Sequence, residues 1–233
     1  MDRTTQIPEK RQPLLNIPRK YKQAYGLAAG TFALSLYMAS NHLLLFEPRY
    51  LPFTSIDQVV PFVPASIWIY FSAFILIGIP YFAENRIKEA KKYLEAFFII
   101  AGISVVIFWL WPTTYPRARF PLPAGVDFLT AYIFTSMRSL DSMTNCAPSL
   151  HVSGSYIAAL SLWSSARSKP RTLFFFVWAT IVAVSTMSTK QHYFFDVVSG
   201  LLLAVAAHAY VFNRAAATRT IVRPVLALLR MFN

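Results

Sequence analysis

The stretch that decides the fold is QVVPFVPASIWIYFSAFILIGIPYFA, residues 58–83, which carries no charged side chain across 26 positions. A helix that crosses a bilayer needs roughly 17–25 predominantly apolar residues. This run is therefore long enough for one transmembrane helix, which we expect to begin near Ser66. In lipid the backbone N–H and C=O groups must form hydrogen bonds within the protein, so we expect such a segment to be helical.

Further apolar runs of similar length lie on both sides of this stretch. They occupy residues 24–46, 96–116 with an end near Trp111, a segment inside 142–166, 172–189 and 192–213. The sequence therefore predicts an all-α, polytopic membrane protein built as a bundle of six transmembrane helices. Residues 23–213 would form the membrane domain, between short basic tails at 1–22 and 214–233.

Composition supports this class of protein. Of the 233 residues, 56% are hydrophobic and 14% are charged, whereas soluble domains carry about 25% charged residues. These proportions exclude a disordered chain and argue against an ordinary soluble domain. One cysteine, Cys146, excludes an intrachain disulfide and a cysteine-rich zinc site.

The formal net charge of +12 has two explanations, a nucleic-acid partner or a membrane topology signal. With a cytoplasmic N-terminus, six spans place 17 Lys and Arg residues on the cytoplasmic side and 5 on the other. Cytoplasmic loops carry such an excess of positive charge. We therefore expect the N-terminus and the C-terminus inside, with no nucleic-acid partner. The bilayer, and anionic headgroups near the tails, are the expected surroundings.

Three polar clusters fall on the opposite, non-cytoplasmic face in this topology. They are 115–121 in the longest loop, 145–151 at the start of the fourth span, and 185–192 between the fifth and sixth spans. Polar residues at the ends of spans are functional candidates. Within the same loop, 127–141 is too short to cross the membrane, and we expect a short interfacial helix there.

The clusters contain the residue types needed for phosphoryl transfer. His192 and Asp196 are four residues apart and share one helix face. A carboxylate that holds one imidazole nitrogen leaves the other nitrogen free to act as a nucleophile. His151 supplies a second imidazole for proton transfer, and the guanidinium groups of Arg117 and Arg119 suit phosphate. Together they predict transfer through a phosphohistidine.

Two motifs carry a family resemblance. Pro-Ser-Leu-His at 148–151 and S-T-x5-H-x3-D at 185–196 resemble the second and third signatures of the type 2 phosphatidic acid phosphatase superfamily. The Ser-Leu-His variant and the segment 56–64 (IDQVVPFVP) resemble its inositol phosphorylceramide synthase branch. The resemblance extends over roughly residues 56–200.

The resemblance implies a six-helix bundle with a site that needs no metal or other cofactor. It assigns His192 as nucleophile, His151 as general acid–base, Asp196 as the residue that orients His192, and Ser149 as a phosphate contact. Arg117 and Arg119 would bind phosphate, although the family's spacing of a lysine before an Arg-Pro pair is missing. Thr186 stands where the superfamily has arginine, and Lys190 is a candidate replacement for that charge.

The sequence favours a lipid phosphatase, acting on a lipid phosphate or pyrophosphate, because hydrolysis needs no second substrate site. A headgroup phosphotransferase is the alternative, and a non-catalytic lipid-binding or transport protein is a rival. A metal site formed by His151, His192 and Asp196 is a further rival. Ser149 and Asp196 also have a purely structural interpretation as helix caps. We expect a bacterial inner membrane, with the site on the periplasmic side, and the oligomeric state stays open.

Overall fold

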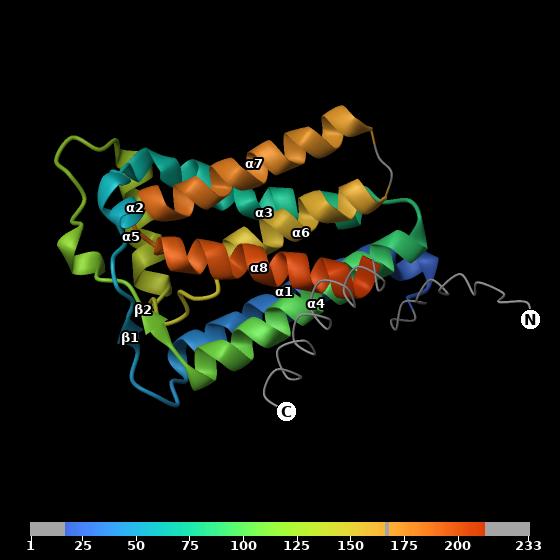
Figure 1. Ribbon diagram of the computed structural model, residues 1–233, viewed down its shortest axis with the longest axis horizontal. Helices are drawn as coiled ribbons and strands as arrows, with labels where there is room; N and C mark the ends of the chain where they lie inside the picture. The colour runs from blue at the N-terminus through green and yellow to red at the C-terminus, as the bar shows by residue number, and fades with distance from the viewer. Residues whose placement is uncertain (1–16, 166–167, 213–233) are drawn as a thin grey trace, which may run out of the picture.

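The computed structural model describes residues 17–165 and 168–212, and this part of the chain is mostly helical (Figure 1). The basic tails expected at 1–22 and 214–233 therefore lie largely outside the described residues. The α-helices are α1 (Lys22–His42), α2 (Ser55–Val59), α3 (Ile67–Phe82), α4 (Ile87–Leu110), α5 (Phe128–Leu140), α6 (Leu150–Ser164), α7 (Lys169–Ser188) and α8 (Phe194–Phe212). Three 3-10 turns are η1 (Arg19–Tyr21), η2 (Pro64–Ser66) and η3 (Arg117–Arg119).

One short sheet departs from the all-α expectation. Strand β1 (Arg49–Tyr50) pairs in parallel with β2 (Thr113–Thr114), with Arg49 opposite Thr113. Each strand has two residues, which is too short to show an alternating pattern in the sequence. The pair ties the loop after α1 to the loop after α4.

Helix α6 lies at the centre of the bundle, where it packs against α3, α4, α7 and α8, while α1 packs mainly against α4. Small residues allow the close packing: Ala158 and Ala159 of α6 are fully buried, as is Ala204 of α8. The serines of α6 bond to carbonyls within the helix, as Ser161 does to Ala158 at 2.8 Å. Such bonds satisfy Ser153 and Ser161 within the buried helix, whereas the hydroxyl of Ser155 is buried without a partner among the described residues.

Four helical segments are long and apolar enough to cross a membrane among the described residues. They are Pro64–Phe82, Ile87–Leu110, Lys169–Ser188 and Phe194–Phe212. The expected first span corresponds to α1, in which Gly, Ser, Thr and Tyr interrupt the apolar residues. The expected fourth span corresponds to α6, which has 15 residues. Four of the six expected spans are thus supported, and the count of six stays a prediction.

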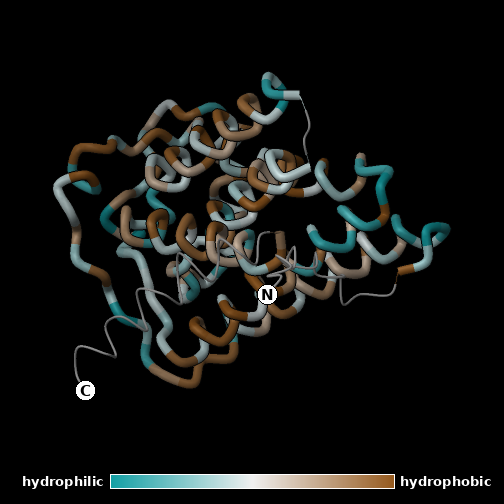
Figure 2. The backbone as a smooth tube through the Cα atoms, turned by 45° about the vertical axis from the view of Figure 1, so that its right-hand side comes forward, coloured by the Kyte–Doolittle hydropathy of each residue, from teal (hydrophilic) through white to brown (hydrophobic). Residues whose placement is uncertain are grey.

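The outer faces of the long helices are apolar. Exposed residues on α3, α4, α7 and α8 include Ile75, Val106, Ile181 and Leu202, each at least 46% exposed. Figure 2 shows apolar residues along the helices and hydrophilic residues concentrated toward the ends of the bundle. Apolar residues exposed along four long helices suit a protein surrounded by lipid.

The loops that carry the polar clusters gather at one end of the bundle, together with α2, α5 and the β1–β2 pair (Figure 1). The amide of Cys146 donates to the carbonyl of Thr113 at 3.2 Å, and the Tyr193 hydroxyl donates to the carbonyl of Thr114 at 3.0 Å. The three clusters, far apart in sequence, therefore meet in space. Helix α5, capped by Asp127, lies within a residue of the short helix expected over 127–141.

Candidate active site

His192 lies in the turn just before α8, and Asp196 lies in the first turn of that helix. The imidazole Nδ1 is 3.2 Å from Asp196 Oδ2, which also accepts the backbone N–H of Tyr193 at 2.9 Å. Asp196 is fully buried, and the positive end of the helix dipole favours its carboxylate. When Nδ1 donates to Asp196, the lone pair of Nε2 is left available.

The turn from 186 to 192 fixes the backbone of His192. The carbonyl of Thr186 accepts the N–H groups of both Gln191 and His192 at 3.1 Å. Lys190 has a φ of +54°, a left-handed conformation that non-glycine residues seldom adopt. This reversal ends α7 at Ser188 and turns the chain back into α8.

A second segment caps α8 from a distance. Asp57, in α2, accepts the backbone N–H of Phe194 at 2.7 Å through Oδ1, while its Oδ2 accepts the N–H and hydroxyl of Thr54. An N-terminal N–H group of a helix needs such a partner. The segment 56–64, which the sequence singled out only by resemblance, thus holds the start of the helix that follows His192.

His151 is placed by the start of α6. Ser149 is the N-cap of this helix, where its hydroxyl accepts from the Val152 N–H at 3.4 Å. The N–H of Ser149 donates to the carbonyl of Asp196 at 3.1 Å. A Cβ on Gly200 would lie 2.6 Å from the Ser149 carbonyl oxygen, so glycine is required for this close approach of α6 and α8.

The two imidazoles lie close together at this end of the bundle. Their ring centroids are 6.3 Å apart and the rings are tilted by 56°. His151 stacks on Tyr70 at 4.0 Å and lies edge-on to Phe74 at 5.5 Å. Its Nε2 is buried and has no hydrogen-bond partner in the part of the chain that the structure describes.

Arg117 is held by Asp141. Its two terminal nitrogens donate to the carbonyl and to the carboxylate of Asp141 at 2.6 and 2.7 Å. Asp141 also accepts from Tyr37 and Asn41 of α1. Burial tends to raise the pKa of Asp141, but the Arg117 charge and these hydrogen bonds hold it below its usual range. Arg117 Nε is buried and unpartnered among residues 17–165 and 168–212.

The other cations expected at the phosphate differ in their placement. The ammonium of Lys190 is directed to the carbonyls of Asp57 and Val60, and burial lowers its pKa, opposed by the charge of Asp57. Arg119 is exposed. Within the described residues no hydrogen bond of the Arg119 side chain is found. The structure therefore places Arg117 and Lys190 in contacts at this end, and Arg119 at the surface.

Arg138 is a further cation that the sequence reasoning counted only toward topology. Its Nη1 donates to the carbonyl of Phe120 at 3.0 Å, and its guanidinium lies over the ring of Phe134 at 4.6 Å. Burial and the neighbouring Arg117 lower its pKa to about 10. Its Nε and Nη2 are buried without a partner in the described chain. The signal that could have pointed to it is an arginine on the expected non-cytoplasmic side, within a helix too short to span the membrane.

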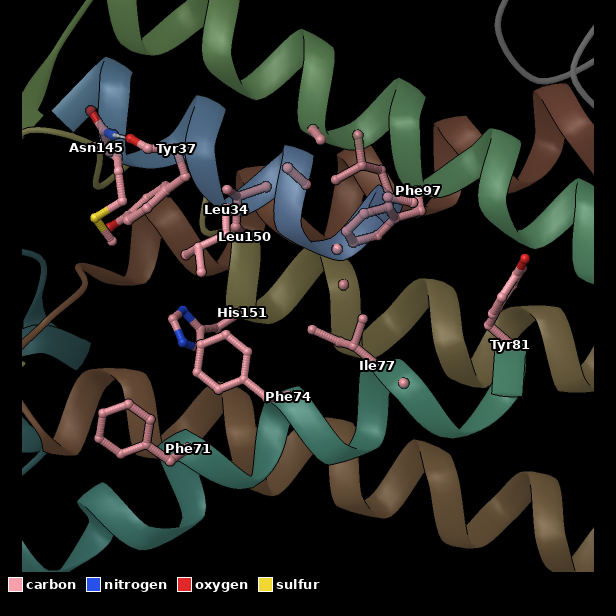
Figure 3. A pocket seen from close by; sticks show the side chains of 18 of the residues that line it. Leu34, Tyr37, Phe71, Phe74, Ile77, Tyr81, Phe97, Asn145, Leu150 and His151 are labelled. Atoms are coloured by element: carbon pink, nitrogen blue, oxygen red, sulfur yellow. Dashed lines mark hydrogen bonds between the residues drawn. The ribbon is translucent and has the colours of Figure 1, made fainter. Parts of the chain in front are cut away.

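A cavity of about 520 Å³ opens beside the two histidines. His151, His192, Asp141 and Asn145 form its polar end, and apolar residues of α1, α3 and α4 line the rest (Figure 3). No group of three or more His, Cys, Asp or Glu side chains in the described residues is placed to hold a metal ion. The arrangement therefore brings two imidazoles, and an aspartate paired with Arg117, to one end of an apolar cavity.

Comparison with known protein families gives a match. The family model of the PAP2 superfamily matches residues 56–210, which include His151, His192 and Asp196. No curated protein matches the chain, and no solved structure matches it.

Proposed function

The chain belongs to the PAP2 superfamily, the type 2 phosphatidic acid phosphatase superfamily, whose members are typically phosphatases or phosphotransferases. From this premise we propose that it is an integral membrane enzyme that hydrolyses a lipid phosphate or pyrophosphate through a phosphohistidine. The observation that carries the proposal is the His192–Asp196 pair, with Nδ1 and Oδ2 3.2 Å apart, which lies beside His151 at the polar end of an apolar cavity.

In the first step, His192 Nε2 attacks phosphorus and the bond from phosphorus to the lipid oxygen breaks. The leaving oxygen takes a proton from His151, which must therefore be protonated at the start of the step. Asp196 stabilises the positive charge that develops on His192. In the second step, water gives a proton to His151 and its oxygen attacks phosphorus. The nitrogen–phosphorus bond breaks and inorganic phosphate leaves.

Phosphate binding in this proposal uses the cations at the same end of the bundle. Arg117 Nε and Arg138 Nε and Nη2 are buried donors without a partner among the described residues, and leaving such donors unpaired is costly. The N-terminus of α6 at Ser149 adds a positive helix end. Lys190 contributes its positive charge while its ammonium contacts the carbonyls of Asp57 and Val60. The role of Arg119 in phosphate binding is supported only by the position of Arg119 in the loop sequence.

The membrane placement is part of the proposal. Six helices, α1, α3, α4, α6, α7 and α8, cross the bilayer, with both termini in the cytoplasm. The distribution of 17 and 5 basic residues supports this orientation. The site then faces the periplasm of a bacterial inner membrane.

Transfer to an alcohol is a second candidate, and one observation favours it. The segment 56–64 resembles the inositol phosphorylceramide synthase branch. Its Asp57 accepts a hydrogen bond from the backbone N–H of Phe194, the first residue of α8. In a transferase, an alcohol takes the place of water in the second step and the enzyme carries a headgroup phosphate. A new phosphodiester, formed when inositol or another polyol is added, would favour transfer over hydrolysis.

The proposal is tested by phosphate release from phosphatidic acid and from an isoprenyl pyrophosphate, with enzyme purified in detergent. His192→Ala removes the nucleophile, so release should fall by at least about 10⁴-fold. His42→Ala is the matched control, because His42 is exposed at the end of α1, and it should keep full activity. Undiminished release by His192→Ala would overturn the mechanism. Lipid binding by the wild type without any release would favour a non-catalytic lipid-binding protein.

A further inference from the structure

We propose that the cavity between α1, α3 and α4 binds a single hydrocarbon tail of the substrate and limits its length at Tyr81. The inference rests on the proposed function, because the phosphate at the histidines supplies the other end of the ligand. The remaining part of the lipid stays in the bilayer.

The cavity has one polar end and an apolar body. The polar end is formed by the two histidines, Asp141 and Asn145, and its body is lined by residues such as Leu34, Phe74, Ile77 and Phe97. Figure 3 shows these side chains arranged from His151 toward Tyr81. An amphiphile whose phosphate lies between the histidines would therefore place its tail along this apolar body.

The cavity extends along most of the length of α3 and α1. On α3 the lining runs from Tyr70, stacked on His151, to Tyr81, which is roughly 16 Å at about 1.5 Å per residue. On α1 it runs from Tyr37 to Gly26, again roughly 16 Å. Tyr81 and Lys22 lie at the ends of α3 and α1 that are opposite to the histidines. A single extended tail of about this length would thus fill the cavity.

The far end is closed by interlocked side chains. The Tyr81 hydroxyl donates to the carbonyl of Lys22 at 2.8 Å, and the Lys22 ammonium donates to the carbonyls of Tyr81 and Glu84, each at 2.8 Å. A Cβ on Gly26 would lie 2.3 Å from the Tyr81 ring. Tyr81 is held by α1 and cannot change its rotamer without breaking these contacts. Its side chain therefore closes the far end of the cavity.

The side of the cavity is open to lipid. Gly30 lines it, yet a Cβ added there meets nothing within 4 Å. Leu34 of α1 and Phe74 of α3 also line the cavity, and they are 52% and 56% exposed. Helix α1 makes its main contacts with α4 and few with α3. A tail can therefore enter from the bilayer between α1 and α3.

The test is a series of single-chain alkyl phosphates of increasing length, with kcat/KM for phosphate release as the readout. When the alkyl phosphates are supplied as monomers in water, below the concentration at which they form micelles, each methylene that enters the cavity should raise kcat/KM by about fourfold. The increase should stop when the tail reaches Tyr81. Gly30 lies four residues along α1 from Gly26 and about 6 Å closer to the histidines. Gly30→Leu should fill the cavity at that level, so the increase in kcat/KM should stop at a tail several methylenes shorter than in the wild type.

Gly102→Leu is the matched control. Gly102 lies on α4, is exposed, and an added Cβ there also meets nothing within 4 Å, but it does not line the cavity. Both changes replace a helical glycine with a strong helix former, so neither should impair folding. A length limit that stays unchanged in Gly30→Leu, or that shifts equally in Gly102→Leu, would overturn the proposal.

A second readout separates this inference from the proposed function. Alkylphosphonates with a photoreactive group at the tail tip bind without being cleaved, and the labelled peptide is identified by mass spectrometry. Tips of full length should label residues 78–82 or 22–30, and Gly30→Leu should suppress that labelling. Labelling of these residues without any phosphate release would refute the proposed enzymatic activity and would still support the proposed tail site. Release with labelling elsewhere would refute the tail site alone.

Discussion

The two oxygens of Asp196 have different surroundings. Oδ2 accepts hydrogen bonds from His192 and from the Tyr193 backbone, whereas Oδ1 is buried without a partner among the described residues. Asp196→Asn keeps the shape but removes the charge that stabilises a positively charged imidazole. We expect kcat to fall by about 10²–10⁴-fold with little change in KM. Steady-state kinetics on one lipid phosphate measures this, and a rise in KM with kcat unchanged would mean that Asp196 serves binding instead.

Arg138 is predicted to bind the phosphate, through Nε and Nη2. Hydrogen bonds to charged groups contribute about 1.5–3 kcal/mol, so Arg138→Gln should raise KM by roughly 10–150-fold. Arg49→Gln is the control, because Arg49 is an exposed cation in β1 at the same end of the bundle. Equal effects of the two changes on KM would indicate general electrostatic attraction, in place of a specific contact.

The ion pair between Arg117 and Asp141 makes stability depend on pH. The pKa of Asp141 is lower in the folded chain than its ordinary value, so its stabilising contribution is present above the ordinary pKa near 3.9. That contribution is lost as the pH falls through the lowered pKa. We expect the wild type to lose thermal stability in this acidic range more steeply than Asp141→Asn, measured by thermal unfolding in detergent. Parallel pH profiles would contradict this role of the pair.

At the scale of elements, the approach of α6 to α8 sets the distance between the two histidines. Gly200→Ala places a methyl group 2.6 Å from the Ser149 carbonyl, and overpacking of this kind costs about 1–3 kcal/mol. The apparent melting temperature should fall and phosphate release should fall with it. Gly102→Ala, where an added Cβ meets nothing, should leave both unchanged or slightly improved. A Gly200→Ala protein with wild-type stability would show that the helices adjust freely.

The sequence predicted most helices because long apolar runs and glycine or proline boundaries are local signals. It also predicted which motifs hold His151, His192 and Asp196, and the structure brings these residues together. The contacts of Asp57 with Phe194, and of Asp141 with Arg117 and α1, join segments far apart in the chain. No local pattern reports such contacts, so Asp57, Asp141 and Arg138 received no role. The strands β1 and β2 were missed because each has only two residues.

At the scale of the whole molecule, the proposed orientation places the two ends of the bundle on opposite sides of the membrane. Arg119 and Lys88 are both exposed, at the site end and in the first turn of α4. In a Cys146→Ala background, Arg119→Cys should react with an impermeant maleimide on intact cells, and Lys88→Cys should react only after lysis. The reverse pattern would invert the orientation, and reaction of both on intact cells would break the sidedness on which the topology depends.

The account depends most directly on a covalent bond between phosphorus and His192. Enzyme mixed with a ³²P-labelled lipid phosphate and quenched within milliseconds in alkali should carry an acid-labile label. Mass spectrometry should place that label on His192, and His192→Ala should carry none. A label on another residue, or steady phosphate release with no label on His192 at any quench time, would contradict the central claim.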